Sequence, residues 1–249
     1  MGMREEVSIT TFDPSRFRDP LYTMSEAARI VDVPASTFRT WACGRVAVQL
    51  RGARAGGGPI ITRASVTARS KLRSIPFVGL TEAMVLAAIR KSGVPMQRIR
   101  PALAQLEKGL GLQYALASRR LYSDGAELLF DYSESHPDSQ VARVTRQLVV
   151  VRNNQHVFSD VIEEYLQRFE YAPDGYVKLI QVPGYEQAEI VVDPHRSSGA
   201  PIFARGGCRV KDVLYRYRAG ETVQELTMEF GVPASHVEDA IRVASRRAA

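Results

Sequence analysis

One pattern occurs three times along the chain and constrains its fold more than any other feature. An apolar-periodic run leads into Asp-Val-Pro or Gly-Val-Pro, and a second apolar-periodic run follows. Asp or Gly can adopt the left-handed conformation that ends a helix, and Pro fits the start of the next one. The sequence therefore predicts three helix pairs joined by tight turns. These turns are Asp32-Val33-Pro34, Gly93-Val94-Pro95 and Gly231-Val232-Pro233, within Ser25–Trp41, Thr81–Leu106 and Thr222–Ala244.

Charge distinguishes the first pair from the third, although both contain Val-Pro-Ala-Ser. Residues 33–120 carry 15 basic and 2 acidic side chains, and no Asp or Glu occurs between Val33 and Thr81. An acid-free basic stretch indicates an anionic partner such as nucleic acid, although a solvated basic face or a purely structural corner has the same pattern. We interpret the first corner as a DNA reader and the third as a folding or partner-binding corner. The third would repel phosphate because it carries Glu221, Glu225, Glu229, Glu238 and Asp239.

The second helix of the first pair, from Pro34 to about Ala42, leads into a Gly-rich basic loop. Loose alternation of apolar and polar residues and Gly56-Gly57-Gly58 predict a β-wing with a flexible tip there. No nucleotide-binding glycine motif is present, so these glycines are not interpreted as a phosphate-binding loop. Trp41 is expected to anchor the helix in the core. Base contacts would come from the helix and phosphate contacts from the wing. The candidate DNA-binding residues are Ser36, Thr37, Arg39 and Thr40 in the helix and Arg45, Arg51, Arg54 and Arg63 in the wing.

Residues 121–194 reverse the charge balance, with 5 basic and 13 acidic side chains. Asp124-Gly125 between two apolar stretches predicts a β-hairpin, and RQLVVV, YVKLIQV and AEIVVD are further strand candidates. Helical spacing predicts a helix over 157–169, and another helix is expected over 65–74. Ser133–Ser139 is expected to form a flexible loop. This segment therefore reads as a small mixed α+β unit whose charge disfavours DNA contact.

The C-terminal segment mixes arginine and tyrosine around a helix expected over Lys211–Ala219. Protein interfaces are enriched in these two residue types, although a solvated basic helix has the same pattern. The candidate partner-binding residues are Arg205, Arg209, Lys211, Tyr215, Arg216 and Tyr217.

No arrangement of residues in the sequence indicates catalysis, a cofactor or a metal. Cys43 and Cys208 have no Cys-x-x-Cys spacing, the four histidines are scattered, and no Gly-x-Ser-x-Gly motif occurs. The N-terminus lacks a signal-peptide core, and the longest apolar run, Ala83–Ile89, has only seven residues. These observations predict a cytoplasmic, non-enzymatic protein without metal, cofactor or membrane contact.

Thr23–Trp41 (TMSEAARIVDVPASTFRTW) resembles the winged helix-turn-helix of MerR-type regulators, with residues 37–41 standing where that family has Thr-Leu-Arg-x-Trp/Tyr. Taken whole, the chain is similar to VapBC-type antitoxins that join this domain to a small C-terminal helical module. The motifs behind this resemblance are Phe77-x-x-Leu80-x-Glu82, residues 93–100, Asp124-Gly125, residues 171–175, Asp193-Pro194, Gly199-x-Pro201-Ile202, Arg209-Val210 and residues 220–223.

The resemblance implies a partner toxin with a PIN-type ribonuclease fold, encoded by the adjacent gene. Arg205 and Arg209 are the candidates for insertion into its acidic, metal-binding cleft, because a planar guanidinium can pair bidentately with carboxylates. The chain lacks the long C-terminal coiled coil by which MerR-type proteins dimerise. A homodimer or toxin–antitoxin hetero-oligomer would therefore use another contact, for which the central unit is a candidate.

These features predict a mainly helical α+β fold in three parts. Residues 1–120 would form the winged helix-turn-helix domain, 121–192 a connecting or dimerisation unit, and 193–249 a helical, helix-turn-helix-like module. The expected function is that of an antitoxin that binds operator DNA for autoregulation and neutralises a PIN-type ribonuclease. Two alternatives stay open. One is a stand-alone MerR-like regulator whose C-terminal module binds a small ligand or dimerises, and the other is a ribonuclease or DNA-processing enzyme that uses the acidic middle segment.

Overall fold

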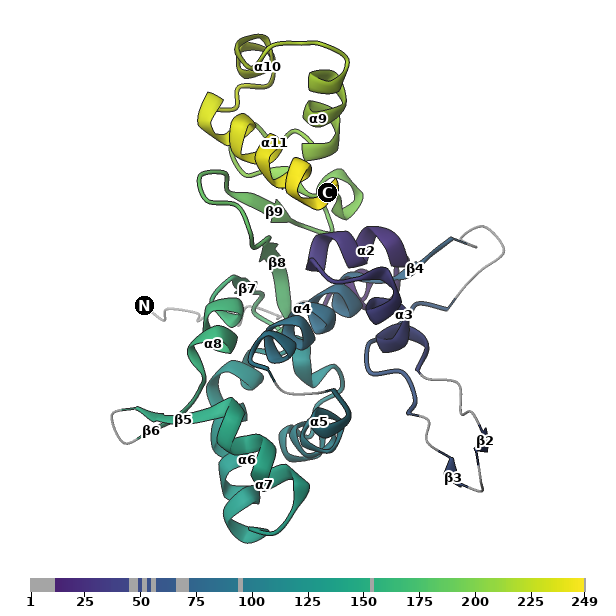
Figure 1. The fold of residues 1–249 in the computed structure, drawn as a ribbon, viewed down its shortest axis with the longest axis vertical. Helices are drawn as coiled ribbons and strands as arrows, with labels where there is room; N and C mark the ends of the chain where they lie inside the picture. Colours follow the sequence, from purple (N-terminus) through teal and green to yellow (C-terminus); the bar gives the residue numbers. More distant parts are fainter. Residues whose placement is uncertain are drawn as a thin grey trace, which may run out of the picture.

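The fold was analysed in a computed structural model, which describes residues 12–248 apart from 45–48, 51–52, 55–56, 66–71, 94–95 and 153–154. About half of the chain is helical, and short antiparallel strands supply the sheets, so the predicted α+β class is confirmed. Figure 1 shows the first helix pair beside a central helix, with one helical group below that helix and the C-terminal helices at the opposite end of the molecule.

The first predicted helix pair is confirmed as α2 (Met24–Val31) and α3 (Ala35–Cys43). A capping box starts α2: the Thr23 side chain accepts the Glu26 N–H, and the Glu26 carboxylate accepts the Thr23 N–H. Asp32 then adopts a left-handed φ of 60° and ends the helix, and α3 begins directly after the proline. The elements around this pair are α1 (Ser15–Arg18), β1 (Tyr22–Thr23), β2 (Gln49–Leu50), β3 (Ala53–Arg54) and β4 (Arg73–Ile75).

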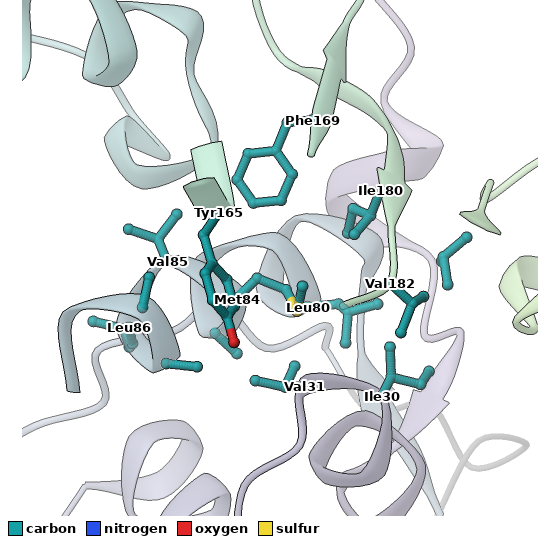
Figure 2. Close-up of a cluster of buried hydrophobic side chains, with 14 of the residues drawn as sticks. Ile30, Val31, Leu80, Met84, Val85, Leu86, Tyr165, Phe169, Ile180 and Val182 are labelled. Carbon is teal, nitrogen blue, oxygen red and sulfur yellow. The ribbon is translucent and has the colours of Figure 1, made fainter. Parts of the chain in front are cut away.

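Helix α4 (Phe77–Lys91) lies at the centre of the molecule and is buried from Phe77 to Ile89. A helix that is apolar on all sides must be covered on all sides, and α4 contacts α2, α8 (Asp160–Leu166) and β8 (Val177–Gln181). One continuous core therefore joins the N-terminal helices to the later parts of the chain. Figure 2 shows Leu80, Met84, Val85 and Leu86 of α4 with Ile30 and Val31 of α2, and with Tyr165, Phe169, Ile180 and Val182.

The structure contradicts the hairpin predicted at Asp124-Gly125. Both residues lie inside helix α6 (Arg119–Ser135), where buried side chains recur at helical spacing. Gly125 serves close packing instead of a turn, because a Cβ there would lie 3.1 Å from the side chain of Leu121 and from the ring of Phe158. The helical periodicity of the apolar residues therefore outweighs the local turn signal.

Two predicted helices also differ from the observed elements. Within 157–169 the helix α8 is shorter, because Val157 belongs to β6 (Gln155–Phe158) and Phe169 begins β7 (Phe169–Tyr171). Pairing with neighbouring strands holds both residues extended. The helix predicted over 65–74 is wrong at its end, where β4 pairs with β1 and buries Ser74 and Ile75, and residues 66–71 lie outside the described part.

The remaining middle elements follow the predicted order with shifted boundaries. Helix α7 occupies the start of the strand predicted at RQLVVV, so only its end forms β5. The predicted loop at 133–139 is confined to 136–139, because α6 continues to Ser135. The second corner is present, with Gly93 at a φ of 87° between α4 and α5. The bounds are α5 (Met96–Leu110), η1 (Ala115–Ala117), α7 (Gln140–Leu148) and β5 (Val149–Arg152).

A four-stranded antiparallel sheet in the order β10-β9-β8-β7 leads into the C-terminal helices. Strands β9 (Ile190–Val192) and β10 (Ile202–Phe203) come from the two sides of the predicted boundary at 192/193, and the division into three domains stays a prediction. Helix α9 spans Val210–Arg218. The third corner is confirmed as α10 (Val223–Phe230) and α11 (Ala234–Ala248), joined by a left-handed Gly231.

Candidate nucleic-acid interface

Helix α3 has a buried anchor and a polar solvent face. Phe38 and Trp41 are buried, which places Trp41 in the core as expected. On the opposite face Ser36 and Arg39 are exposed and Thr40 is half-buried, with the Thr40 hydroxyl donating to the Ser36 carbonyl at 2.9 Å. No acidic residue occurs in this helix. The face therefore offers hydroxyls and one guanidinium, which are groups that contact base edges and phosphates.

Two further arginines lie beside α3. The guanidinium of Arg90, at the end of α4, donates to the Thr37 hydroxyl at 3.0 Å. Arg63 contacts the other end of the helix through Cys43 Sγ at 3.7 Å. Arg63 was a candidate from the sequence, whereas Arg90 was missed because it lies 53 positions from Thr37. Its only sequence signal was membership of the basic stretch 33–120.

The predicted wing is present as the antiparallel hairpin of β2 and β3, in which Gln49 pairs with Arg54. Figure 1 shows this hairpin projecting from the same side of the molecule as α3. Arg45, Arg51 and the side chain of Arg54 lie outside the described part of the structure, so their DNA contacts stay predictions.

The glycines of the wing do not form its tip, which corrects the prediction for Gly56-Gly57-Gly58. The tip of the hairpin falls between β2 and β3, before these glycines, and Gly56 lies outside the described part. Gly57 and Gly58 instead pass the end of α3, where a Cβ on Gly44 would lie 2.5 Å from the Gly57 carbonyl oxygen. Arg100 of α5 donates to the Gly58 carbonyl at 2.8 Å. Gly44 therefore permits close backbone packing at the base of the wing, whereas a Cβ on Gly58 would contact nothing within 4 Å.

A buried carboxyl group fixes the chain that returns from the wing. Glu82 of α4 accepts the Thr62 N–H at 2.5 Å and the Thr62 hydroxyl at 3.1 Å. Burial raises the pKa of Glu82 to about 7, although these hydrogen bonds act in the opposite direction. Gly79, one turn earlier in α4, leaves room for the backbone at Thr62, since a Cβ on residue 79 would overlap the Thr62 carbonyl oxygen.

The third corner has the same backbone signals as the first but a different surface. When the two corners are aligned on their shared Val-Pro-Ala-Ser, Glu238 stands at the position of Arg39 and Asp239 at that of Thr40. Asp239 is buried and accepts the N–H groups of residues 186, 187 and 188 at 2.7–2.9 Å. Burial alone would raise its pKa, but these bonds and Arg242 lower it to about 2. At the position equivalent to Thr40 this helix is thus attached to the chain's own loop, and at the position equivalent to Arg39 it exposes a carboxylate in place of a guanidinium.

The candidate partner-binding residues occupy three kinds of position in the structure: exposed, pocket-lining and ion-paired. Arg205 is exposed in the turn before α9, where Gly206 and Gly207 have φ of 92° and 68°. Tyr215 is 74% and Tyr217 40% exposed. Arg209 and Lys211 line a pocket beside α2, described below.

Arg216 differs from the other candidates because its charge is already compensated. It pairs with Glu221 at 2.6 Å and with Glu229, and its guanidinium lies 5.3 Å from the centre of the Phe230 ring. These contacts hold α9 against α10. Met228, 77% exposed on α10, was not a candidate, because the sequence does not distinguish an exposed methionine from a buried one.

Among the residues the structure describes, no helix combines the length and apolarity needed to cross a membrane. Within the same residues, no three His, Cys, Asp or Glu side chains gather where they could hold a metal ion.

Comparison with known families agrees with this geometry. Residues 20–103, which contain the helix pair α2–α3 and the wing, match the family described as "Putative DNA-binding HTH domain". Residues 190–244 match a family described as "Protein of unknown function (DUF433)". The two matches thus fall in the N-terminal and C-terminal parts of the chain.

The relatives define the family more closely. The chain is 44% identical over 227 residues to the "Putative antitoxin VapB45" of Mycobacterium tuberculosis. The aligned region covers 91% of this chain and 94% of that protein. It belongs to the same family. A second relative, the uncharacterized protein Rv2308 of the same organism, is 27% identical and covers 96% of this chain and 94% of its own length. The crystal structure of Rv2018 from M. tuberculosis has a TM-score of 0.79 at 43% identity, and covers 91% of this chain and 99% of that one.

Proposed function

We propose that the chain is an antitoxin that binds its own operator through α3 and the wing, as MerR-type regulators do, and neutralises a PIN-type ribonuclease through its C-terminal module. The observation that carries the DNA half is the acid-free face of α3 with Arg39 exposed and Arg63 and Arg90 beside it. Membership of the VapB45 family supports the toxin half. A protein of this kind performs no catalysis of its own.

Arg39 is the base-reading candidate of this proposal, while Ser36, Thr37 and Thr40 shape the same face. Arg63, Arg45, Arg51 and Arg54 would contact phosphates, which position a protein on DNA without reading sequence. A bidentate arginine–guanine contact contributes about 1–3 kcal/mol of discrimination. Loss of Arg39 should therefore reduce specificity, and loss of a phosphate contact should weaken binding to all duplexes.

The DNA half is tested by fluorescence anisotropy with the protein's own promoter and a scrambled duplex. We expect Arg39→Ala to weaken promoter binding by about tenfold or more and scrambled binding much less. The matched control is Arg143→Ala, an exposed arginine of α7 in the acidic segment, which should change neither. Equal losses on both duplexes would make Arg39 a phosphate contact, and no retention of any duplex at low salt would refute DNA binding.

For the toxin half we propose that Arg205 enters the acidic cleft of the ribonuclease. Its position on a two-glycine turn lets it project, and no described carboxylate forms an ion pair with it. Tyr215, Tyr217 and Met228 supply exposed contact area on the same module. Arg216 is assigned to holding that module together, and Arg209 and Lys211 to the edge of the contact.

Co-expression with the adjacent open reading frame tests this assignment. We expect growth arrest only when the chain is absent, and co-purification of the two proteins. Arg205→Ala should restore ribonuclease activity while promoter binding is retained, and Arg246→Ala, an exposed arginine near the end of α11, should behave as wild type. Undiminished inhibition by the Arg205→Ala/Arg209→Ala double variant would remove both residues from the toxin contact. No toxic neighbour at all would favour a stand-alone regulator.

A further inference from the structure

A pocket of about 700 Å³ lies where the helix-turn-helix meets the C-terminal module. One wall comes from α2 and the β1–β4 pair, and the other from α9, α11 and the turn at 197–201. Figure 1 shows α2 directly below the C-terminal helices. Pockets of this size bury a small molecule, so the junction has room for one.

Positive charge dominates the lining of this pocket. Six cationic side chains line it, against one carboxylate, and that carboxylate belongs to Glu26, which accepts the Thr23 N–H in the cap of α2. The cations come from both halves of the molecule. They are Arg29, Arg73, Arg209, Lys211, Arg218 and Arg247.

Three of these cations, Arg209, Lys211 and Arg218, have no carboxylate partner among the described residues, whereas Glu26 interacts electrostatically with Arg29 and Arg73. Arg247 pairs with Asp32 at 3.7 Å. Cations that converge without an anion repel one another, and a bound multivalent anion would relieve that repulsion. Guanidinium groups favour phosphate for this purpose, because their planar fork donates two parallel hydrogen bonds.

The rest of the lining is apolar and includes an aromatic ring. Ile30, Leu214 and Val243 supply aliphatic surface, and Tyr185 contributes its ring, over which the Arg247 guanidinium lies at 5.9 Å. A ligand that fills the pocket therefore has an apolar or planar portion besides its charge, since inorganic phosphate alone would leave this surface uncovered.

Two independent irregularities lie next to each other where the two walls meet. Ser197, Ser198 and Gly199 have consecutive left-handed φ angles of 50°, 54° and 73°. For residues other than glycine this conformation costs about 1–2 kcal/mol each, and such strain concentrates at ligand sites. Beside this turn the hydroxyl of Tyr22, a residue that is 3% exposed and lines the pocket, has no hydrogen-bond partner among the described residues.

We propose that this pocket is a binding site for a small phosphorylated ligand of nucleotide size. The basic side chains hold the phosphate groups, and the aliphatic side chains and Tyr185 cover the planar portion. Because α2 and α9 both contribute cations, the ligand bridges the DNA-reading and C-terminal parts. The proposal does not depend on the identity of the toxin.

Isothermal titration calorimetry of the full-length chain tests the proposal, with ATP, AMP, adenosine and inorganic phosphate as probes. We expect ATP or AMP to bind at least about tenfold more tightly than adenosine or phosphate alone, because only nucleotides satisfy both parts of the pocket. Thermal unfolding at saturating nucleotide should show a raised Tm. Absence of binding by every probe at millimolar concentration would overturn the proposal.

The variant Arg29→Gln/Arg218→Gln removes one cation from each wall, and Lys211→Gln removes a single exposed one. Both should weaken nucleotide binding, the double variant by about tenfold or more. The matched control, Arg143→Gln/Arg246→Gln, removes two exposed arginines outside the pocket and should leave nucleotide binding within about twofold of wild type. Equal weakening by this control would indicate non-specific attraction and refute the site. Displacement of the nucleotide by operator duplex, with equal loss of DNA binding in the pocket variants, would assign these cations to DNA instead.

Discussion

Asp239 attaches the third helix corner to a neighbouring loop. Its buried carboxylate accepts three consecutive main-chain N–H groups, so α11 is attached to the loop before β9. The folded pKa of about 2 lies below the ordinary value of 3.8. The stabilisation is therefore complete above about pH 4 and is lost as the pH falls towards 2, and it amounts to about 2 kcal/mol.

We expect Asp239→Ala to lower the free energy of unfolding by about 2–3 kcal/mol at pH 7, because it leaves the loop N–H groups without an acceptor. Urea unfolding of both proteins at pH 7 and pH 3 measures the difference. The gap should shrink at the lower pH. Glu238→Ala is the control, since that neighbour is exposed, and a comparable loss in this control would refute the assignment to Asp239.

The pKa of Glu82 is shifted in the opposite direction to that of Asp239. Its folded pKa of about 7 exceeds the ordinary 4.5, so the folded state keeps a proton that the unfolded state releases. This group therefore favours folding most below about pH 4.5, and that contribution declines as the pH rises through 7.

We expect Glu82→Gln to remove this decline, because glutamine stays neutral and its carbonyl oxygen can still accept the Thr62 N–H. The Tm of the variant minus that of the wild type should increase from pH 5 to pH 8. The increase should correspond to about 1–3 kcal/mol of unfolding free energy. Differential scanning calorimetry across this range gives the measurement. A pH-independent difference in Tm would show that Glu82 does not titrate there.

At the scale of elements, Gly79 joins α4 to the chain that returns from the wing. A Cβ at this position would overlap the Thr62 carbonyl oxygen, whereas a Cβ at Gly109 in α5 would lie 3.4 Å from a flexible leucine side chain. We expect Gly79→Ala to destabilise the fold by about 1–3 kcal/mol and to weaken operator binding, because it displaces the base of the wing. Gly109→Ala should be neutral or stabilising by up to about 1 kcal/mol, because alanine favours the helix. Wild-type stability of Gly79→Ala would contradict the close approach.

The helix corners could be predicted from the sequence because their signals are local. In both α2–α3 and α10–α11, a left-handed Asp or Gly lies two positions before a proline, and a capping threonine begins the first helix of the pair. The same local reasoning failed at Asp124-Gly125, where the turn signal is genuine but the apolar spacing around it forms a helix. Only the packing of Phe158 against Gly125 explains why glycine stands there.

At the scale of the whole molecule, the sequence predicted the helix that is proposed to read DNA but not the side chains from distant segments that lie beside it. Ser36 and Arg39 follow from the amphipathic pattern of one helix, whereas Arg90, Arg100 and the basic pocket depend on contacts between distant segments. The excess of positive charge in 33–120 was visible in the sequence, but five of the six cations that line the pocket lie outside that range. Several wing arginines lie outside the described part, so their roles rest on the sequence alone.

The shared core predicts how the molecule unfolds. Leu80 of α4 is fully buried in the cluster that also contains Val31 of α2 and Ile180 of β8. We expect one cooperative calorimetric transition, and Leu80→Ala should lower its midpoint by the equivalent of about 2–5 kcal/mol without splitting it. Leu72→Ala, which changes an 81% exposed leucine, should leave the midpoint unchanged. Two separable transitions would show that the parts fold independently.

The enclosure of α4 also bears on how such a protein would be removed from a cell. A protease that gains entry by local opening of this helix exposes the surfaces of α2, α8 and β8 together, since all three pack against it. If the chain acts as proposed, such turnover would relieve repression of the operon and release the partner in a single event.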